Sequence, residues 1–238
     1  MISIVIPAYN EEKTVEQTVR QFKALAVPHE VIVSDTASTD RTVAVARACA
    51  DKVVMLPEHK KRDASTGRNG GAMAAEGEYI VFLDCGTMIP DPNEFFDKAL
   101  ARFLRKPGLA GISVRIEVEP PVRTKSDAAV SFLMNAWFLF LNNAAGVGIA
   151  SGKFQMVPRT IFLKSGGFRE TLDTAEDVDF FGRLRKFGRT EIVWELAAYH
   201  SGRRFHELGA WRTLFRWIKN AVSFWLFKKP SDEWEPVR

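Results

Sequence analysis

The chain has 238 residues, 46% hydrophobic and 26% charged, which is the balance of an ordinary globular protein. The net charge of +4 suits phosphorylated ligands or an anionic membrane surface but selects neither. Two cysteines exclude a disulfide framework, and no apolar run reaches the roughly 20 residues of a membrane-spanning helix. We therefore expect a cytoplasmic protein without a signal peptide.

Strand and helix patterns alternate through the first half of the chain. Short apolar runs predict strands, and apolar residues at spacings of three and four predict helices. Strands are expected at 2–6, 30–34, 53–56 and 79–83, and helices at 11–25, 42–50, 69–75 and 93–104. This alternation predicts an α/β fold with a mainly parallel central sheet and right-handed crossovers.

The second half is less regular. Strands are expected at 111–118, 154–157, 191–194 and 197–200, and helices at 127–142, 159–164, 176–186 and 208–227. No linker rich in proline, glycine or serine divides the chain. Residues 1–205 are therefore expected to form one domain, and residues 206–238 a C-terminal amphipathic helix and polar tail.

Polar side chains follow three of the predicted strands. After the first come Pro7, which we expect to stop the strand, Tyr9, whose ring can stack on a base, and Glu11, which we expect to open a helix. Asp35 follows the second strand and Asp84 follows the fourth. Ligands of open α/β sheets bind beyond the carboxyl ends of the strands. These positions therefore indicate one ligand site, although helix capping explains the first group equally well.

Two helix starts carry further candidates. Arg68 follows a basic loop and can pair with a phosphate, whereas Lys60 and Lys61 in that loop are expected to be solvated. Glu176 and Asp177 open a later helix. Adjacent carboxylates at such a position either cap the helix or supply a general base.

In order and spacing, these groups resemble the family-two glycosyltransferases with the GT-A fold. The matching segments are 5–12, 35–42, 67–70, 76–84, 165–168 and 176–177. The resemblance implies a Rossmann-like nucleotide-diphospho-sugar transferase fold. It also implies an inverting transfer of a sugar from a nucleoside-diphosphate donor to a sugar or polyprenyl-linked acceptor, with no nucleic acid as partner.

The resemblance also implies a role for each candidate residue. Asp177 would be the catalytic base, with Glu176 beside it. Asp84 would be the first aspartate of the family's Asp-X-Asp element, near the ribose and diphosphate. The nucleotide-binding residues would be Pro7, Tyr9, Glu11, Asp35, Arg68 and Asp84.

The sequence departs from the family pattern at Gly86, where the second aspartate of Asp-X-Asp is expected. A divalent metal, Mn²⁺ or Mg²⁺, held by Asp84 and His200 is one interpretation. A second is a catalytically weak nucleotide-sugar-binding or scaffold protein on the same fold. A sugar nucleotidyltransferase is disfavoured, because no glycine-rich phosphate loop follows the first strand. A further alternative is that arginines carry the charge without metal, namely Arg68, Arg203 and Arg204.

The C-terminal helix combines aromatic and basic residues. Such a helix either lies in a membrane interface or packs on the core or a second chain, and both interpretations stay open. The aromatic-rich segment 132–141 could extend the same surface, which would suit a lipid-linked acceptor and a peripheral position on the cytosolic face of a membrane. The apolar residues concerned are Trp211, Leu214, Phe215, Ile218, Val222, Trp225 and Leu226, and the basic ones are Arg212, Arg216, Lys219, Lys228 and Lys229.

Overall fold

The computed structural model describes residues 1–58, 63–172 and 174–227. Its strands are β1 (Ile2–Ala8), β2 (His29–Asp35), β3 (Lys52–Met55), β4 (Tyr79–Leu83), β5 (Thr87–Met88), β6 (Leu109–Val118), β7 (Phe154–Pro158) and β8 (Arg189–His200). Its helices are α1 (Val15–Arg20), α2 (Thr42–Arg47), α3 (Ala64–Met73), α4 (Pro92–Arg105), α5 (Lys125–Leu139), the π-helix η1 (Phe140–Ala144), α6 (Arg159–Ser165), α7 (Glu176–Leu184), α8 (Arg203–Leu208) and α9 (Ala210–Phe227).

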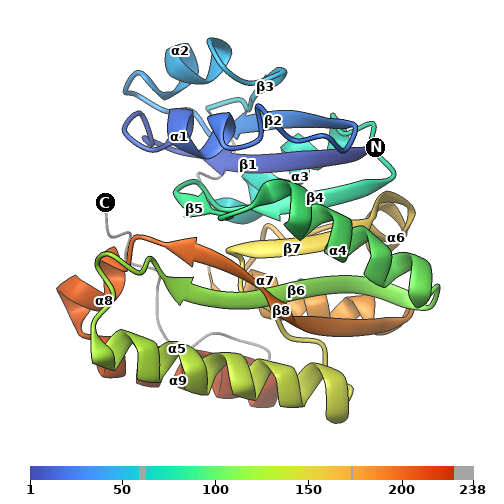
Figure 1. Cartoon of the computed structure of the whole chain (residues 1–238), viewed down its shortest axis with the longest axis vertical. Coiled ribbons are helices and arrows are strands. Elements are labelled where there is room, and N and C mark those ends of the chain that lie inside the picture. Colours follow the sequence, from blue (N-terminus) through green and yellow to red (C-terminus); the bar gives the residue numbers. More distant parts are fainter. Residues whose placement is uncertain (59–62, 173, 228–238) are drawn as a thin grey trace.

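The strands form one sheet in the order β3-β2-β1-β4-β7-β6-β8-β5 (Figure 1). Strands β3, β2, β1 and β4 pair in parallel, and so do β6 and β8. Strand β7 is antiparallel to both of its neighbours, and β5 is antiparallel to β8. The predicted α/β fold with a mainly parallel central sheet is confirmed.

Helices cover both faces of the sheet, as Figure 1 shows with α4 in front and α3 and α7 behind. One apolar cluster joins the sheet to α1, α4 and α5 through buried residues such as Val19, Phe96 and Val130. A second joins the other face to α3, α6 and α7, where the Phe168 and Phe180 rings pack at 4.1 Å. Both clusters lie on strands that are buried on two sides, which explains their nearly continuous apolar sequence.

Pro7 does not stop the first strand, which was the expectation. β1 continues to Ala8, and Pro7 pairs with Ser34 of β2. On its other side, β1 pairs with β4 as far as Val5. Proline is tolerated at this position because no hydrogen bond from β4 requires the N–H that Pro7 lacks.

Other element boundaries also differ from the expectations. α1 begins at Val15, so Glu11 lies in the turn before the helix and does not open it. The two strands expected at 191–194 and 197–200 are one strand, β8, whose register against β6 shifts between Val114 and Arg115. β5 and α8 were not predicted, because each is short and leaves little periodicity in the sequence. The helix expected at 127–142 is α5 continued by the first residues of η1.

The C-terminal helix forms as α9, which contacts α5 (Figure 1). Leu214 is buried against the core, whereas Trp211, Phe215 and Ile218 are exposed. Within the described part of the chain, no helix is both long and apolar enough to cross a membrane. Several residues predicted to matter have side chains outside the described residues, namely Lys60, Lys61, Val222, Trp225, Leu226, Lys228 and Lys229.

Candidate active site

The predicted site residues meet at one edge of the sheet. In register, Ala8 of β1 lies beside Asp35, so the carboxyl ends of β1 and β2 coincide. β7 starts opposite the end of β4, where Phe154 pairs with Leu83. β8 also ends at this edge, where His200 pairs with Thr87 of β5, the short strand that follows β4. The rule for strand ends therefore correctly predicted that these strands end at one edge of the sheet, and the ligand site at that edge stays a prediction.

Arg68 is the centre of this edge. Its side chain is buried, with 1% of the residue exposed. One terminal nitrogen donates to Glu176 Oε1 at 2.9 Å, and the other to Asp84 Oδ1 at 2.7 Å and to the Gly152 carbonyl at 3.3 Å. Burial disfavours the charge, but the nearby carboxylates, led by Asp84, outweigh it and raise the pKa of the guanidinium above its usual value. Arg68 thus holds together residues from β4, α7 and the loop before β7, and its contact with a nucleotide stays a prediction.

Small residues bring Arg68 to this position. Asp63 is the N-cap of α3, and its carboxylate accepts the Thr66 N–H. A Cβ at Gly67 would lie 2.8 Å from Pro7 Cβ, and one at Gly71 would lie 2.4 Å from Val5 Cγ1. The helix therefore packs directly on β1, which a larger side chain at either glycine would prevent.

Asp177 and Arg68 both bond to the backbone of Gly152, Asp177 through the N–H and Arg68 through the carbonyl. Its two carboxylate oxygens accept the backbone N–H groups of Gly152 and Val178, each at 2.8 Å. Burial and the charge of Glu176 raise the pKa of the Asp177 carboxyl to about 7, against the opposing effect of Arg68. The residue is partly exposed, so a carboxyl that gains and loses a proton near neutral pH is presented at this edge.

The loops after β1 and β2 are joined to each other. Asn10 N–H donates to Ser38 Oγ at 2.8 Å, and Asn10 Oδ1 accepts the Thr39 N–H at 2.8 Å. Asp35 Oδ2 accepts the Ser38 N–H at 2.9 Å, whereas its Oδ1 is buried with no hydrogen-bond partner among the described residues. An unpaired buried carboxylate oxygen is costly, so this atom points to a missing donor.

Three further side chains, those of Tyr9, Glu11 and Asp40, lie in the loops after β1 and β2. Tyr9 is partly exposed in the turn after β1, and Glu11 accepts the Thr14 hydroxyl at 2.5 Å. Asp40, for which we favour a structural role, accepts hydrogen bonds from Thr42 and from the Glu12 N–H. Its pKa lies below the usual value because these hydrogen bonds outweigh the effect of burial.

The residues proposed for a divalent metal do not form a good ligand set. Both Asp84 oxygens face cations, Arg68 at 2.7 Å and Lys153 at 3.7 Å. His200 Nδ1 accepts the Gly202 N–H at 3.1 Å, and burial with the charge of Lys153 lowers the pKa of the ring to about 3. In that neutral form the proton sits on Nε2, which leaves no free lone pair for an ion. Among the described residues, no group of three or more His, Cys, Asp or Glu side chains is placed to hold a metal.

Four residues of this region were given no role in the sequence analysis, although two of them, Asn69 and Phe168, lie in the segments that resemble the family. Asn69 bonds both the N–H and the carbonyl of Phe168, each at 2.9 Å, and the Arg68 guanidinium lies 5.2 Å from the centre of that ring. Gly152 joins Arg68 to Asp177, and Lys153 contacts Asp84. A glycine-rich stretch before β7 was recognisable, but the pairing of β7 with β4 that places Lys153 was not.

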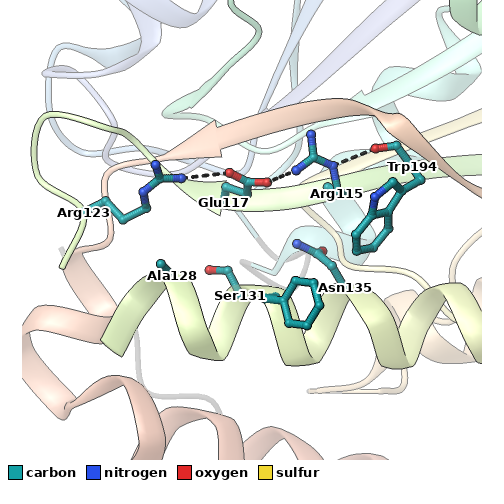
Figure 2. Close-up of a pocket in the computed structure, with 8 residues that line it drawn as sticks. Arg115, Glu117, Arg123, Ala128, Ser131, Asn135 and Trp194 are labelled. Carbon is teal, nitrogen blue, oxygen red and sulfur yellow. Dashed lines mark hydrogen bonds and ion pairs between the residues drawn. The ribbon is translucent and has the colours of Figure 1, made fainter. Parts of the chain in front are cut away.

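A pocket of about 200 Å³ lies apart from these residues, between α5 and the strands β6 and β8 (Figure 2). Arg115 and Arg123 both pair with Glu117, and Arg115 Nε donates to the Trp194 carbonyl at 2.6 Å. Its charged groups therefore largely satisfy one another. The edge that carries Arg68 is the better candidate because two carboxylates pair with this buried cation and the pKa of the neighbouring Asp177 is raised.

Comparisons with known proteins identify the family of the chain. The sequence profile described as "Glycosyl transferase family 2" matches residues 3–164. The chain is 36% identical over 95 residues to a validoxylamine A glucosyltransferase of Streptomyces hygroscopicus subsp. jinggangensis, covering 37% of this chain and 22% of that protein. It is 24% identical to a poly-beta-1,6-N-acetyl-D-glucosamine synthase of Staphylococcus epidermidis, covering 100% of this chain and 57% of that protein. The chain thus spans less than two thirds of these curated relatives.

Solved structures show the same fold. A mannosyltransferase from Pyrobaculum calidifontis, in complex with GDP-Man and Mn²⁺, superposes with a TM-score of 0.73 at 19% identity and covers 99% of this chain and 65% of that one. The glucosyl-3-phosphoglycerate synthase of Mycobacterium tuberculosis, in complex with Mn²⁺ and UDP-glucose, gives 0.61 at 22% identity, covering 94% and 78%. The GT-A fold expected from the resemblance is confirmed. The chain belongs to glycosyl transferase family 2.

Proposed function

We propose that the protein transfers a sugar from a nucleoside-diphosphate sugar to an acceptor hydroxyl, with inversion at the anomeric carbon. The acceptor oxygen forms a bond to the anomeric carbon and gives its proton to Asp177. The bond from that carbon to the diphosphate oxygen breaks, and the diphosphate leaves with the electron pair. A hydroxyl is a poor nucleophile until a positioned carboxylate takes its proton, which is the role we assign to Asp177.

The placement of Asp177 is the observation that carries this proposal. Arg68 links Asp84, at the end of β4, to Glu176, while Gly152 bonds both Arg68 and Asp177. The two carboxylates expected to act on the donor and on the acceptor thus belong to one hydrogen-bonded group. A pKa of Asp177 near 7 suits a base that works at neutral pH.

The nucleoside would bind at the ends of β1 and β2. Asp35 Oδ1 is buried without a partner, and a base N–H or a ribose hydroxyl would satisfy it. Tyr9 is partly exposed after β1 and would stack on the base. Pro7 and Glu11 would complete this wall of the pocket.

A thermal-shift panel of UDP, GDP and their sugars, each with Mn²⁺ or with EDTA, tests donor binding. A ligand that binds the folded state raises the Tm. We expect one nucleotide series to stabilise the protein, and Asp35→Ala to reduce that shift. If no member of the panel raises the Tm, the proposed function fails. Proton NMR of the product formed from the stabilising donor then distinguishes inversion from retention.

The alternative is a nucleotide-sugar-binding or scaffold protein with little catalysis. The observation that favours it is Gly86, which removes a carboxylate from the Asp-X-Asp position. Both functions predict binding in the thermal-shift panel. They differ in donor turnover, because the binding protein would release no nucleoside diphosphate above the rate of a blank.

For the acceptor, we propose a lipid-linked molecule reached from a membrane surface. The outward face of α5 and η1 is apolar, with Phe132, Leu133, Trp137 and Phe140 between 47% and 61% exposed. The acidic residue of α5, Asp127, is buried. An apolar face of this kind without exposed carboxylates suits the interface of an anionic bilayer.

The neighbouring α9 adds to this surface. Trp211 and Phe215 are exposed, Arg212 and Lys219 are exposed as well, and residues 210–227 include no acidic side chain. Basic side chains beside exposed aromatic ones add attraction to anionic lipids. If the acceptor is a polyprenyl phosphate, its nucleophile is already ionised and Asp177 contributes less to the rate.

Vesicle flotation tests this surface. We expect binding to vesicles of phosphatidylcholine with phosphatidylglycerol and weaker binding to phosphatidylcholine alone. Trp137→Glu should weaken binding about ten-fold or more, because a buried aromatic ring contributes roughly 1.5–3 kcal/mol. The matched control is Leu104→Glu on α4, where the residue is 78% exposed away from this face. Equal losses in the two variants, or no binding by the parent, would contradict a membrane role for α5.

A further inference from the structure

Asp84 contacts two cations that differ in their access to solvent. Arg68 is fully buried, and both of its terminal nitrogens are bonded to protein oxygens. The Lys153 ammonium lies 3.7 Å from Asp84 Oδ2, and its side chain is 33% exposed. Of these two cations, Lys153 is therefore the one that can reach a ligand at the end of β4 without breaking a buried ion pair.

The backbone fixes the position of Lys153. β4 and β7 pair antiparallel, with Leu83 opposite Phe154. The Asp84 N–H donates to the Lys153 carbonyl at 3.3 Å, which extends this pairing by one residue. The two residues thus lie opposite each other across neighbouring strands, which places the Lys153 side chain within reach of Asp84.

The missing carboxylate makes this cation significant. Gly86 adopts φ +80° and presents no side chain where a second metal ligand is expected. Asp84 Oδ1 is bonded to Arg68, and His200 Nδ1 already accepts the Gly202 N–H. A leaving diphosphate still requires positive charge, and the protein places an ammonium beside Asp84.

We propose that Lys153 supplies the positive charge that a protein-bound divalent ion would otherwise provide at the donor diphosphate. This inference rests on the proposed function for the identity of the donor. As the bond from the anomeric carbon to the diphosphate oxygen breaks, the electron pair passes to that oxygen. The Lys153 ammonium donates a hydrogen bond to it and stays protonated, while Asp84 holds the ammonium in place.

Isothermal titration of UDP and GDP, with the matching nucleosides uridine and guanosine, tests this role. The parent should bind its nucleoside diphosphate in EDTA, with little change on addition of Mn²⁺. Lys153→Met should weaken diphosphate binding about ten-fold or more, as expected for a charge-assisted hydrogen bond, while nucleoside binding is unchanged. Lys153→Arg should restore most of the affinity because it keeps the charge.

The matched control is Lys98→Met, because Lys98 also pairs with a carboxylate, Glu94, but lies on α4. It should leave both affinities unchanged. Diphosphate binding that requires Mn²⁺, or that survives Lys153→Met, would overturn the role of Lys153 and leave the proposed function standing. Absence of any nucleotide or nucleoside binding by the parent would overturn both.

Discussion

Replacing Arg68 by Met removes the cation around which the site is built. Arg68 bonds Asp84 at 2.7 Å and Glu176 at 2.9 Å, and the two carboxylates are 27% and 18% exposed. Breaking a buried ion pair by removing one partner costs roughly 3–5 kcal/mol, and partial exposure of the acids places this case near 3 kcal/mol. For a protein of this size, that loss lowers the Tm by roughly 6–12 °C.

The same substitution should change the pH dependence of the reaction. Arg68 lowers the pKa of Asp177, so its removal should move the midpoint of the rate–pH profile above the parental value of about 7. Differential scanning calorimetry and donor turnover between pH 5 and about pH 9 measure the two effects. The control is Arg183→Met, which breaks a largely buried ion pair with Asp179 on the same helix. It should lower the Tm and leave the midpoint in place. An Arg68→Met protein with parental Tm and midpoint would refute the reasoning.

Three further predictions follow from individual contacts. The pKa of Asp177 is raised on folding, so the free energy of unfolding should fall as the pH rises from about 4 to about 7. Asp177→Asn lacks this ionisation, so its Tm minus the parental Tm should increase across that window. A decrease in this Tm difference would contradict the prediction. The pKa of His200 is lowered on folding, so the stability that this residue contributes is lost as the pH falls from about 6.5 towards 3. In urea titrations, the free energy of unfolding of His200→Gln should therefore fall less than that of the parent over this pH range. A Cβ at Gly152 would lie 2.3 Å from an Arg68 nitrogen, so Gly152→Ala should cost roughly 1–3 kcal/mol in urea unfolding, whereas Gly108→Ala, with open space around it, should cost far less.

The sequence correctly predicted that the candidate site residues lie at one edge of the sheet, because strand ends and the residues after them are local features. Asp35 and Asp84 could be placed together on that ground alone. The pairing of Arg68 with Glu176 could not be predicted, because Glu176 lies 108 residues further along the chain. The position of Lys153 depends on the antiparallel pairing of β4 and β7, which no local pattern encodes.

Some expectations failed because tertiary context overrode a local rule. Pro7 was expected to end β1, but the neighbouring strand demands no hydrogen bond from it. For Arg68, no local pattern indicated its contacts within the protein, where its nitrogens are bonded to carboxylates and a carbonyl, and its contact with a phosphate stays a prediction. A basic residue near a helix start does not reveal in the sequence whether its partner is a ligand or another part of the chain.

The rate of donor turnover against pH, for the parent and for Asp177→Asn, tests the central claim most directly. The donor is the sugar nucleotide that stabilises the protein, and water serves as the acceptor, so no unidentified acceptor is needed. We expect the parental rate to rise with a midpoint near pH 7, and the variant to lose roughly 10²–10⁴-fold of that rate while still binding the donor. A variant that keeps the parental rate and midpoint would show that Asp177 is not the base.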